Sequence, residues 1–263
     1  GLRFRGVFHD LLTSQAANSA AADFIKSKIR QKVTNPATAD ILTNIDHPYA
    51  AKRPPIDTHY FETFNKDHVT LVDLQVDPIA EITRNGIVLE SGKYHELDVI
   101  VFATGYDAMT GPLLNLNIET PRASLKSYWE EGPRNYLGLA IPGFPNLFTI
   151  TGPGSPSVLS NMPVSIEQHV DWITECIAHC IETGCTSIEA QEQSAEIWTD
   201  HVRETADATL LPKVQHSWYL GANIPGKPRV FMPYAGGLNM YRKICDNIAA
   251  VSYTHLTLPT RAV

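Results

Sequence analysis

The chain has 263 residues, of which 43% are hydrophobic and 19% are charged, and its formal net charge is −7. A chain of this length can bury a sizeable core, and this composition favours one large or two small globular domains over a disordered or fibrous protein. The negative charge gives no support to a nucleic-acid partner. No apolar run approaches the ~20 residues of a membrane-spanning helix, so no membrane partner is expected. Four cysteines in so long a chain do not indicate a disulfide framework, and the expected location is the cytoplasm.

Residues 1 to about 45 carry a helical pattern. Apolar side chains recur at helical spacing up to residue 33, Asn35-Pro36 interrupts the pattern, and a short helix is expected to follow. The next stretch, Lys52-Arg53-Pro54-Pro55, places two cations on a segment stiffened by two prolines. Such a stretch is typical of an exposed basic loop. It also suits a fixed pair of charges aimed at a phosphate or a developing anion.

A β pattern follows. Residues 69–72 and 98–103 are apolar runs that predict strands, and the second run is typical of a fully buried strand. Between them, Asn85-Gly86 separates two apolar runs, which is the strongest short-range signal for a β-hairpin. Residues 108–145 predict an irregular segment with short helices.

The glycine- and proline-rich stretch at 152–162 is central to the chain. Residues 146–151 before it predict a buried parallel strand. A helix is predicted after it from 164 to 183, ended by Gly184. Its expected apolar stripe consists of Ile166, Val170, Ile173, Ile177 and Ile181. A loop between a strand and a helix N-terminus presents unpaired N–H groups, which suits an anion or an electron-rich ring, although ordinary βα turns have the same order.

Two more helices are predicted beyond this one. The first carries Ala195, Trp198, Val202 and Ala206 on one face, and the last begins near Tyr241. Between them, residues 217–227 form a glycine-proline loop with an aromatic pair, a composition suited to a mobile lid.

His169, Cys176 and Cys180 fall on nearly the same helical face, which raises the question of a metal site. Structural zinc takes four ligands, and no fourth ligand or Cys-x-x-Cys motif is present, so no metal site is predicted. Residues 251–263 do not fit the preceding chain and resemble the translation of a sequencing adapter. We expect them to be an artefact outside the fold.

Several stretches together resemble the C-terminal half of a flavin-dependent Baeyer–Villiger monooxygenase, particularly the phenylacetone and cyclohexanone monooxygenase group. The resemblance is carried by Ala51-Lys52-Arg53-Pro54 and by residues 60–65, 98–107, 143–148, 152–162, 165–170 and 221–229. The loops at 152–162 and 221–229, in this order and spacing, are its specific part. The Ala-Thr-Gly turn at 103–105 occurs in many flavoproteins with two dinucleotide-binding domains.

The resemblance implies an α/β fold, the truncated C-terminal part of a flavoprotein with two Rossmann-like domains that bind FAD and NADP. Residues 1–55 would be a helical segment of the NADP-binding domain with the catalytic-arginine loop, and residues 56–105 the β-rich end of that domain. Residues 106–250 would be the C-terminal portion of the FAD-binding domain. In this family NADPH reduces the flavin, dioxygen adds to form a peroxyflavin, and a small ketone becomes an ester or lactone.

The resemblance also assigns roles to individual residues. Arg53 would be catalytic, because an always-charged guanidinium stabilises both a peroxide anion and the oxyanion that forms at a carbonyl. Lys52 would lie near the NADP phosphate and ribose. The residues expected beside a cofactor are Lys52, Thr104, Gly105, Asp107, Met162, Trp218 and Asn223. The residues expected to line the substrate side of the flavin are Ser157, Val158, Leu159 and Ser160.

Three features of the family are missing. The chain contains no Gly-x-Gly-x-x-Gly fingerprint, no Phe-x-Gly-x-x-x-His signature and no acidic partner for the arginine. We therefore expect a fragment that neither binds FAD tightly nor turns over alone. Two alternatives stay open: a related flavin monooxygenase that oxidises amine nitrogen or thioether sulfur, and a non-catalytic α/β binding module. The sequence does not indicate an oligomeric state.

Overall fold

The computed structural model describes residues 8–257. It divides the chain into two compact units. The first unit runs up to Tyr49 and continues over Arg53–Tyr106, and the second contains Ala50–Lys52 and the chain from Asp107 onward. The assignment of these parts to an NADP-binding and an FAD-binding domain stays a prediction.

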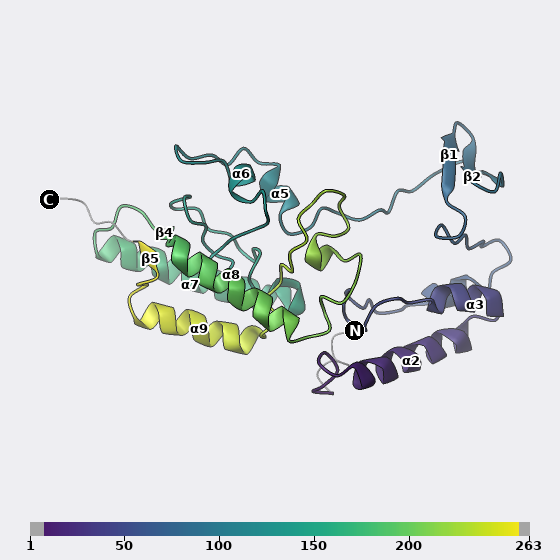
Figure 1. Ribbon diagram of the computed structural model, residues 1–263, viewed down its shortest axis with the longest axis horizontal. Helices are drawn as coiled ribbons and strands as arrows, with labels where there is room; N and C mark the ends of the chain where they lie inside the picture. The colour runs from purple at the N-terminus through teal and green to yellow at the C-terminus, as the bar shows by residue number, and fades with distance from the viewer. Residues whose placement is uncertain (1–7, 258–263) are drawn as a thin grey trace. The chain divides into compact units, whose positions relative to one another are not determined.

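The first unit begins with the predicted helices. α2 spans Gln15–Lys32 and α3 spans Pro36–Thr43, and the two lie side by side (Figure 1). Their N-caps are Ser14 and Asn35, whose side-chain oxygens accept backbone N–H groups of the first turn. Ile29, Val33 and Ala39 form their shared core. The prediction of a helix, an interruption at Asn35-Pro36 and a second short helix is confirmed.

A short helix, α4 (Tyr60–Thr63), follows the Lys52-Arg53 stretch and is tied to the end of α2. Lys32 forms ion pairs with Asp57 and Glu62. Asn65 accepts the backbone N–H of Thr34 at 2.8 Å and donates its amide to the Lys32 carbonyl at 2.7 Å. The segment that follows Arg53 is therefore anchored on α2.

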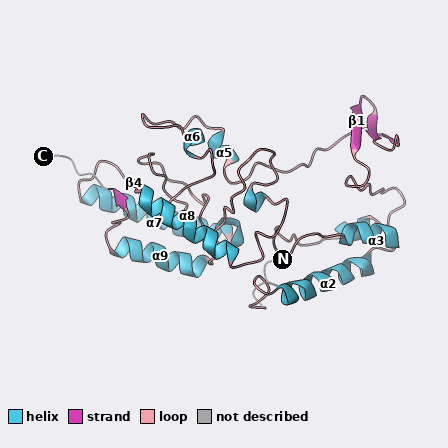
Figure 2. Ribbon diagram, in the orientation of Figure 1, coloured by secondary structure: helices cyan, strands magenta, loops and turns pink. Residues whose placement is uncertain are grey.

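The predicted hairpin, coloured as strands in Figure 2, is present as β1 (Ile79–Thr83) and β2 (Gly86–Leu89). β3 (Tyr94–Glu96) extends it to an antiparallel sheet in the order β1-β2-β3. Its turn residues are Arg84 and Asn85, one position earlier than the sequence indicated, because Gly86 already pairs with Thr83. A Cβ at Gly86 would lie 2.0 Å from the His95 carbonyl oxygen of β3. The glycine thus serves the close approach of β3, which the sequence analysis did not predict.

The two strands predicted at 69–72 and 98–103 are wrong. Neither segment is a strand, and no strand of the described residues pairs with either one. Without a neighbouring strand, the backbone N–H and C=O groups of an apolar run have no ladder to join. Val99 and Val101 are 75% and 82% exposed, so this run lies on the surface of the chain rather than inside it.

Three long helices dominate the second unit: α7 (Met162–Glu182), α8 (Glu192–Asp207) and α9 (Leu238–Ala250). Helices α7 and α9 lie side by side (Figure 1), and buried side chains of all three helices share one core. Within it, the Trp172 indole N–H donates to the Cys245 carbonyl at 3.0 Å. The shorter elements of this unit are α5 (Gly111–Leu114), α6 (Leu125–Tyr128), η1 (Ser157–Leu159), β4 (Glu189–Ala190), η2 (Trp218–Leu220) and β5 (Leu256–Thr257).

Helix α7 has the predicted extent but not the predicted buried face. Ile173 is buried, whereas Ile166, Val170, Ile177 and Ile181 are exposed. The face that packs into the core carries Ser165, His169, Trp172, Cys176 and Cys180. The helix therefore turns polar, aromatic and cysteine side chains toward α9 and leaves a stripe of isoleucine and valine side chains uncovered. The predicted buried face of α8, by contrast, is confirmed, since Ala195, Trp198, Val202 and Ala206 are all buried.

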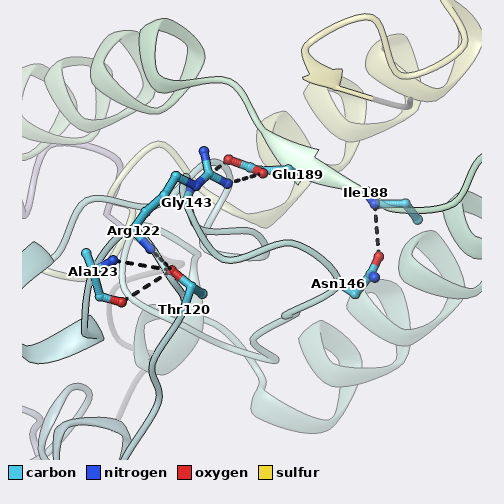
Figure 3. Close-up of polar contacts among 7 residues, drawn as sticks. All are labelled: Thr120, Arg122, Ala123, Gly143, Asn146, Ile188 and Glu189. Atoms are coloured by element: carbon cyan, nitrogen blue, oxygen red, sulfur yellow. Dashed lines mark hydrogen bonds and ion pairs between the residues drawn. The ribbon is translucent and has the colours of Figure 1, made fainter. Parts of the chain in front are cut away.

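The parallel strand predicted at 146–151 is wrong as well. Asn146 and Thr151 both have positive φ, at 62° and 55°, which ends an extended conformation at each side. The Asn146 side chain, at the start of this segment, accepts the Ile188 N–H at 2.9 Å (Figure 3). In the same figure the neighbouring Glu189 accepts the Gly143 N–H, at 2.9 Å, and pairs with Arg122. Burial opposes the charge of Glu189, but these hydrogen bonds lower its pKa below the usual value.

Residues 251–257 pack against the three-helix core. Tyr253 and Leu256 are buried, and β5 pairs with β4 in an antiparallel manner. The expectation that this tail lies outside the fold is therefore wrong for these residues. Its origin as an adapter artefact stays a prediction, and residues 258–263 lie outside the described range. Between residues 8 and 257, no helix is both long and apolar enough to cross a lipid bilayer.

Candidate functional site

A pocket of about 590 Å³ lies against the 152–162 loop, and we call it the loop pocket. All its lining residues belong to the second unit. Apolar side chains make up most of the wall: Ala108, Met109, Leu113, Phe148, Ile150, Val158, Met162 and Trp218. Thr149, Thr151, Gly152 and Ser157 complete it. The structure thus brings together four residues named from the sequence, namely Ser157, Val158, Met162 and Trp218.

Three non-glycine residues of this wall have positive φ: Met109 at 68°, Thr151 at 55° and Ser157 at 42°. Such conformations cost free energy and persist only where surrounding contacts enforce them, and they cluster at functional sites. Met109 and Ser157 also contact each other, since the Ser157 hydroxyl lies 3.5 Å from the Met109 sulfur. The strain supports a functional role for this pocket.

Helix α7 supplies the contacts that hold the strained loop. The Thr151 N–H donates to His169 Nδ1 at 3.0 Å. The Ser160 hydroxyl donates to the Ser157 carbonyl at 2.8 Å, so the Ser165 hydroxyl, 2.5 Å from Ser160, is the donor in that second contact. Ser165 and His169 are four residues apart and share one face of the helix. One helix face therefore fixes the pocket wall at two points.

His169 is fully buried, and its burial lowers the pKa of the imidazole to about 4. The ring is therefore neutral near pH 7, with Nδ1 available as an acceptor and the proton on Nε2. The sequence analysis considered this residue only as a metal ligand. No group of three or more His, Cys, Asp or Glu side chains among residues 8–257 is arranged to hold a metal ion.

The N-terminus of α7 opens beside the loop pocket. Met162, its first residue, lines the pocket, and Pro163 occupies the next position, where no N–H is needed. The Asn161 side chain makes no cap hydrogen bond to any residue from 8 to 257. Backbone N–H groups of the first turn and the positive end of the helix dipole are thus available to an electron-rich ligand.

Residues 217–229, which we call the aromatic loop, are tied down at several points. The Ser217 hydroxyl donates to the Ala51 carbonyl at 3.1 Å, next to Lys52. Lys227 pairs with the Asp107 carboxylate and also donates to the Ala108 carbonyl at 3.3 Å. Trp218, between these two anchors, is half-buried in the pocket wall. The aromatic loop therefore contacts both the segment next to Lys52 and Asp107, and its Trp218 lines the loop pocket.

The other residues named from the sequence lie elsewhere. Leu159 and Ser160 belong to the same loop as Ser157 but do not line the pocket, and Asn223 is exposed on the aromatic loop. Arg53, Thr104 and Gly105 belong to the first unit and are exposed there. Met109, Phe148, Ile150 and Thr151 line the pocket but were missed. Nothing in the sequence signals the positive φ of Met109 or Thr151, since it depends on contacts with distant residues.

Comparison with known proteins gives consistent matches, although no family model matches the chain. A Baeyer–Villiger monooxygenase of Pseudooceanicola batsensis is 45% identical over 95% of this chain and 45% of its own length. The solved structure of an oxidized steroid monooxygenase bound to NADP is 45% identical with a TM-score of 0.90, over 99% of this chain and 49% of that one. The chain is homologous to the C-terminal half of Baeyer–Villiger monooxygenases.

Two further matches extend this finding. Phenazine N-monooxygenase PhzNO1 of Lysobacter antibioticus is 42% identical over 96% of this chain and 46% of its own length. The solved structure of an OTEMO complex with FAD and NADP is 37% identical with a TM-score of 0.90, over 96% of this chain and 46% of that chain. The predicted α/β fold class is confirmed. The chain spans about half the length of the curated relatives that it matches.

Proposed function

We propose that this chain supplies one half of a flavin-dependent monooxygenase that inserts an oxygen atom beside a ketone carbonyl to give an ester or lactone. The observation that carries the proposal is the loop pocket, in which Ser157, Val158 and Met162, expected beside the flavin, share one wall with Trp218, expected beside NADP. Relatives that match this chain over nearly all its length are named as Baeyer–Villiger enzymes, which supports the reaction class.

The cofactors proposed for the complete site are FAD and NADP, both of which the OTEMO structure contains. The apolar wall of the loop pocket and the uncapped start of α7 fit a flat, electron-rich ring system. Met162 would touch the ring, and Trp218 with Lys52 would hold the nicotinamide cofactor. When bound, FAD supplies the activation of dioxygen, and NADPH supplies the reducing equivalents.

Arg53 is proposed as the catalytic cation. Its guanidinium would stabilise the negative charge that develops on the carbonyl oxygen when the oxidant adds to the ketone. Two prolines follow Arg53, and Asp57 four positions later pairs with Lys32 of α2. These constraints support a rigid segment around Arg53 rather than a flexible surface loop. The ketone, dioxygen, a cytoplasmic location and the absence of nucleic acid or membrane stay predictions, and no oligomeric state is proposed.

The experiment joins the N-terminal half of the Pseudooceanicola batsensis enzyme to this chain and measures ester or lactone formation from a panel of cyclic and aryl ketones with NADPH. The joined protein is expected to form product, and Arg53→Ala should lower the rate about 10²–10³-fold without changing the FAD content. Arg84→Ala in the exposed hairpin turn is the matched control and should leave the rate unchanged. Near-normal product formation by the Arg53→Ala protein would refute the role of Arg53.

A second candidate function is oxidation of a heterocyclic nitrogen, which one observation favours: a relative of 42% identity is named a phenazine N-monooxygenase. The same joined protein distinguishes the two. Product from ketones but none from phenazine supports ester formation, whereas N-oxide as the main product would replace the first proposal by the second.

A further inference from the structure

The C-terminal end of α7 is closed by a regular capping motif. The helix ends at Glu182, and Gly184 has a φ of 71°. The Gly184 N–H donates to the Ile181 carbonyl at 3.2 Å, and the Cys185 N–H donates to the Cys180 carbonyl at 2.8 Å. These two bonds define a Schellman motif, which needs a residue in the left-handed region and therefore favours glycine.

A Schellman motif commonly brings together the side chain three positions from the helix end and the side chain just after the glycine. In this chain both positions are cysteines. Cys180 is buried, Cys185 is half-buried, and their thiols share a hydrogen bond. The pairing thus follows directly from the Cys-x-x-x-Gly-Cys spacing at the end of a helix.

A neighbouring hydroxyl fixes the position of the more accessible sulfur. Thr183 Oγ1 lies 3.1 Å from Cys185 Sγ. The same hydroxyl donates its proton to the His179 carbonyl at 2.7 Å, so toward Cys185 it acts as the acceptor. Cys176, one helical turn before Cys180, is fully buried and faces the three-helix core.

We propose that Cys180 and Cys185 form a reversible thiol–disulfide pair that hydrogen peroxide oxidises. The two sulfurs are already in contact, and one of them is accessible to a small oxidant. The proposal concerns a site at the far end of α7 from the loop pocket and does not depend on the oxygenase function.

The order of steps follows from the surroundings of the two thiols. Cys180 is buried whereas Cys185 is half-buried, so the Cys185 sulfur is the one that peroxide reaches first. The Cys185 thiolate attacks one peroxide oxygen, an S–O bond forms, the O–O bond breaks, and the departing hydroxide takes up a proton as water. The Cys180 sulfur then attacks the Cys185 sulfur, an S–S bond forms, and the S–O bond breaks. The second water leaves with the Cys180 proton, so two thiols are oxidised and one peroxide is reduced.

The test treats the whole 263-residue chain with increasing hydrogen peroxide, blocks remaining thiols by alkylation and digests with a Glu-specific protease. Cleavage after Glu175 and Glu182 places Cys176 and Cys180 in one peptide and Cys185 in the next. We expect these two peptides to become joined and dithiothreitol to separate them. Fragment ions that split Cys176 from Cys180 should locate the bond at Cys180. The buried Cys245 should stay reduced and serves as the internal control.

Two variants sharpen the result. Cys185→Ser should abolish the joined peptides while the chain stays folded, since this side chain lies at the surface end of the helix. Gly184→Ala keeps both thiols but opposes the left-handed conformation, and it should slow the joining about fivefold or more. The proposal is overturned if peroxide leaves both thiols open to alkylation, if Cys185 is oxidised to a sulfonic acid without joining, or if the bond forms between Cys176 and Cys180.

Discussion

A single buried histidine holds one strained residue in the wall of the loop pocket. His169 Nδ1 accepts the N–H of Thr151, whose φ is 55°, and no charged form of the ring can make this bond. Because only the neutral imidazole can accept this bond, protonation of His169 at low pH breaks it and weakens the pocket wall.

The expected result is a loss of stability on acidification. Burial lowers the pKa of His169 from 6.5 to about 4, so below pH 6.5 the unfolded chain binds a proton that the folded chain does not. The contribution is complete above pH 6.5 and is lost as the pH falls toward 4, and at 1.36 kcal/mol per pKa unit it amounts to about 3 kcal/mol. Urea unfolding at a series of pH values measures it. His169→Gln keeps an acceptor but cannot titrate, so it should flatten this slope, and an unchanged slope would contradict the assignment.

Whether a residue of the site could be predicted from the sequence depends on how far along the chain its contacts lie. Ser157, Val158, Met162 and Trp218 could be named because the two loops that carry them resemble loops of a known family, and each loop is continuous in the sequence. Met109 could not be named, because its place in the wall depends on Ser157, which is 48 positions away. The role of His169 was hidden for the same reason, since the bond to Thr151 spans 18 positions.

At the level of elements, the aromatic loop depends on the ion pair between Lys227 and Asp107. The Lys227 side chain is only 12% exposed, so replacing it leaves a carboxylate without its nearest counter-charge in a partly enclosed place. Lys227→Met should therefore loosen residues 217–229 and cost on the order of 1–3 kcal/mol of stability. Hydrogen exchange of the loop amides measures the loosening. The exposed Lys213 supplies the control, and equal exchange in Lys213→Met and Lys227→Met would show that the pair does not hold the loop.

The orientation of α7 gives a second prediction at this scale. Ile173 is 8% exposed and Ile177 is 40% exposed, one turn apart on the same helix. Ile173→Ala should destabilise the chain by about 2–5 kcal/mol because it leaves a cavity in the core, whereas Ile177→Ala should stay within about 0.5 kcal/mol. Urea unfolding of the two variants decides the matter. Equal losses would mean that the exposed stripe is covered.

The existence of α2, α3, α7, α8 and α9 was predictable because the apolar spacing that indicates each helix lies within the helix itself. The buried face of α7 was not, because its most regular apolar stripe lies on the exposed side and only the packing of Trp172 and its neighbours selects the other face. Strands were least predictable. The two strands of the hairpin at 79–89 are neighbours in the sequence. The runs at 69–72 and 98–103 pair with no described strand, and within the same described residues the run at 146–151 forms only one isolated bridge, between Phe148 and Ala140.

At the scale of the whole chain, three facts fit together. The chain spans about half the length of its curated relatives, and it leaves apolar surface uncovered on α7 and over residues 99–102. It also lacks every Gly-x-Gly-x-x-Gly fingerprint by which such enzymes would cradle phosphates. We infer that the loop pocket is one side of a flavin site whose phosphate-binding side is not in this sequence.

The FAD content after purification tests this inference most directly. The 263-residue chain purified alone is predicted to carry no FAD, whereas the same chain joined to the N-terminal half of the Pseudooceanicola batsensis enzyme should carry FAD in near-equimolar amount, measured from its absorbance after release. Equimolar FAD on the chain alone, or a folded joined protein without FAD, would contradict the account.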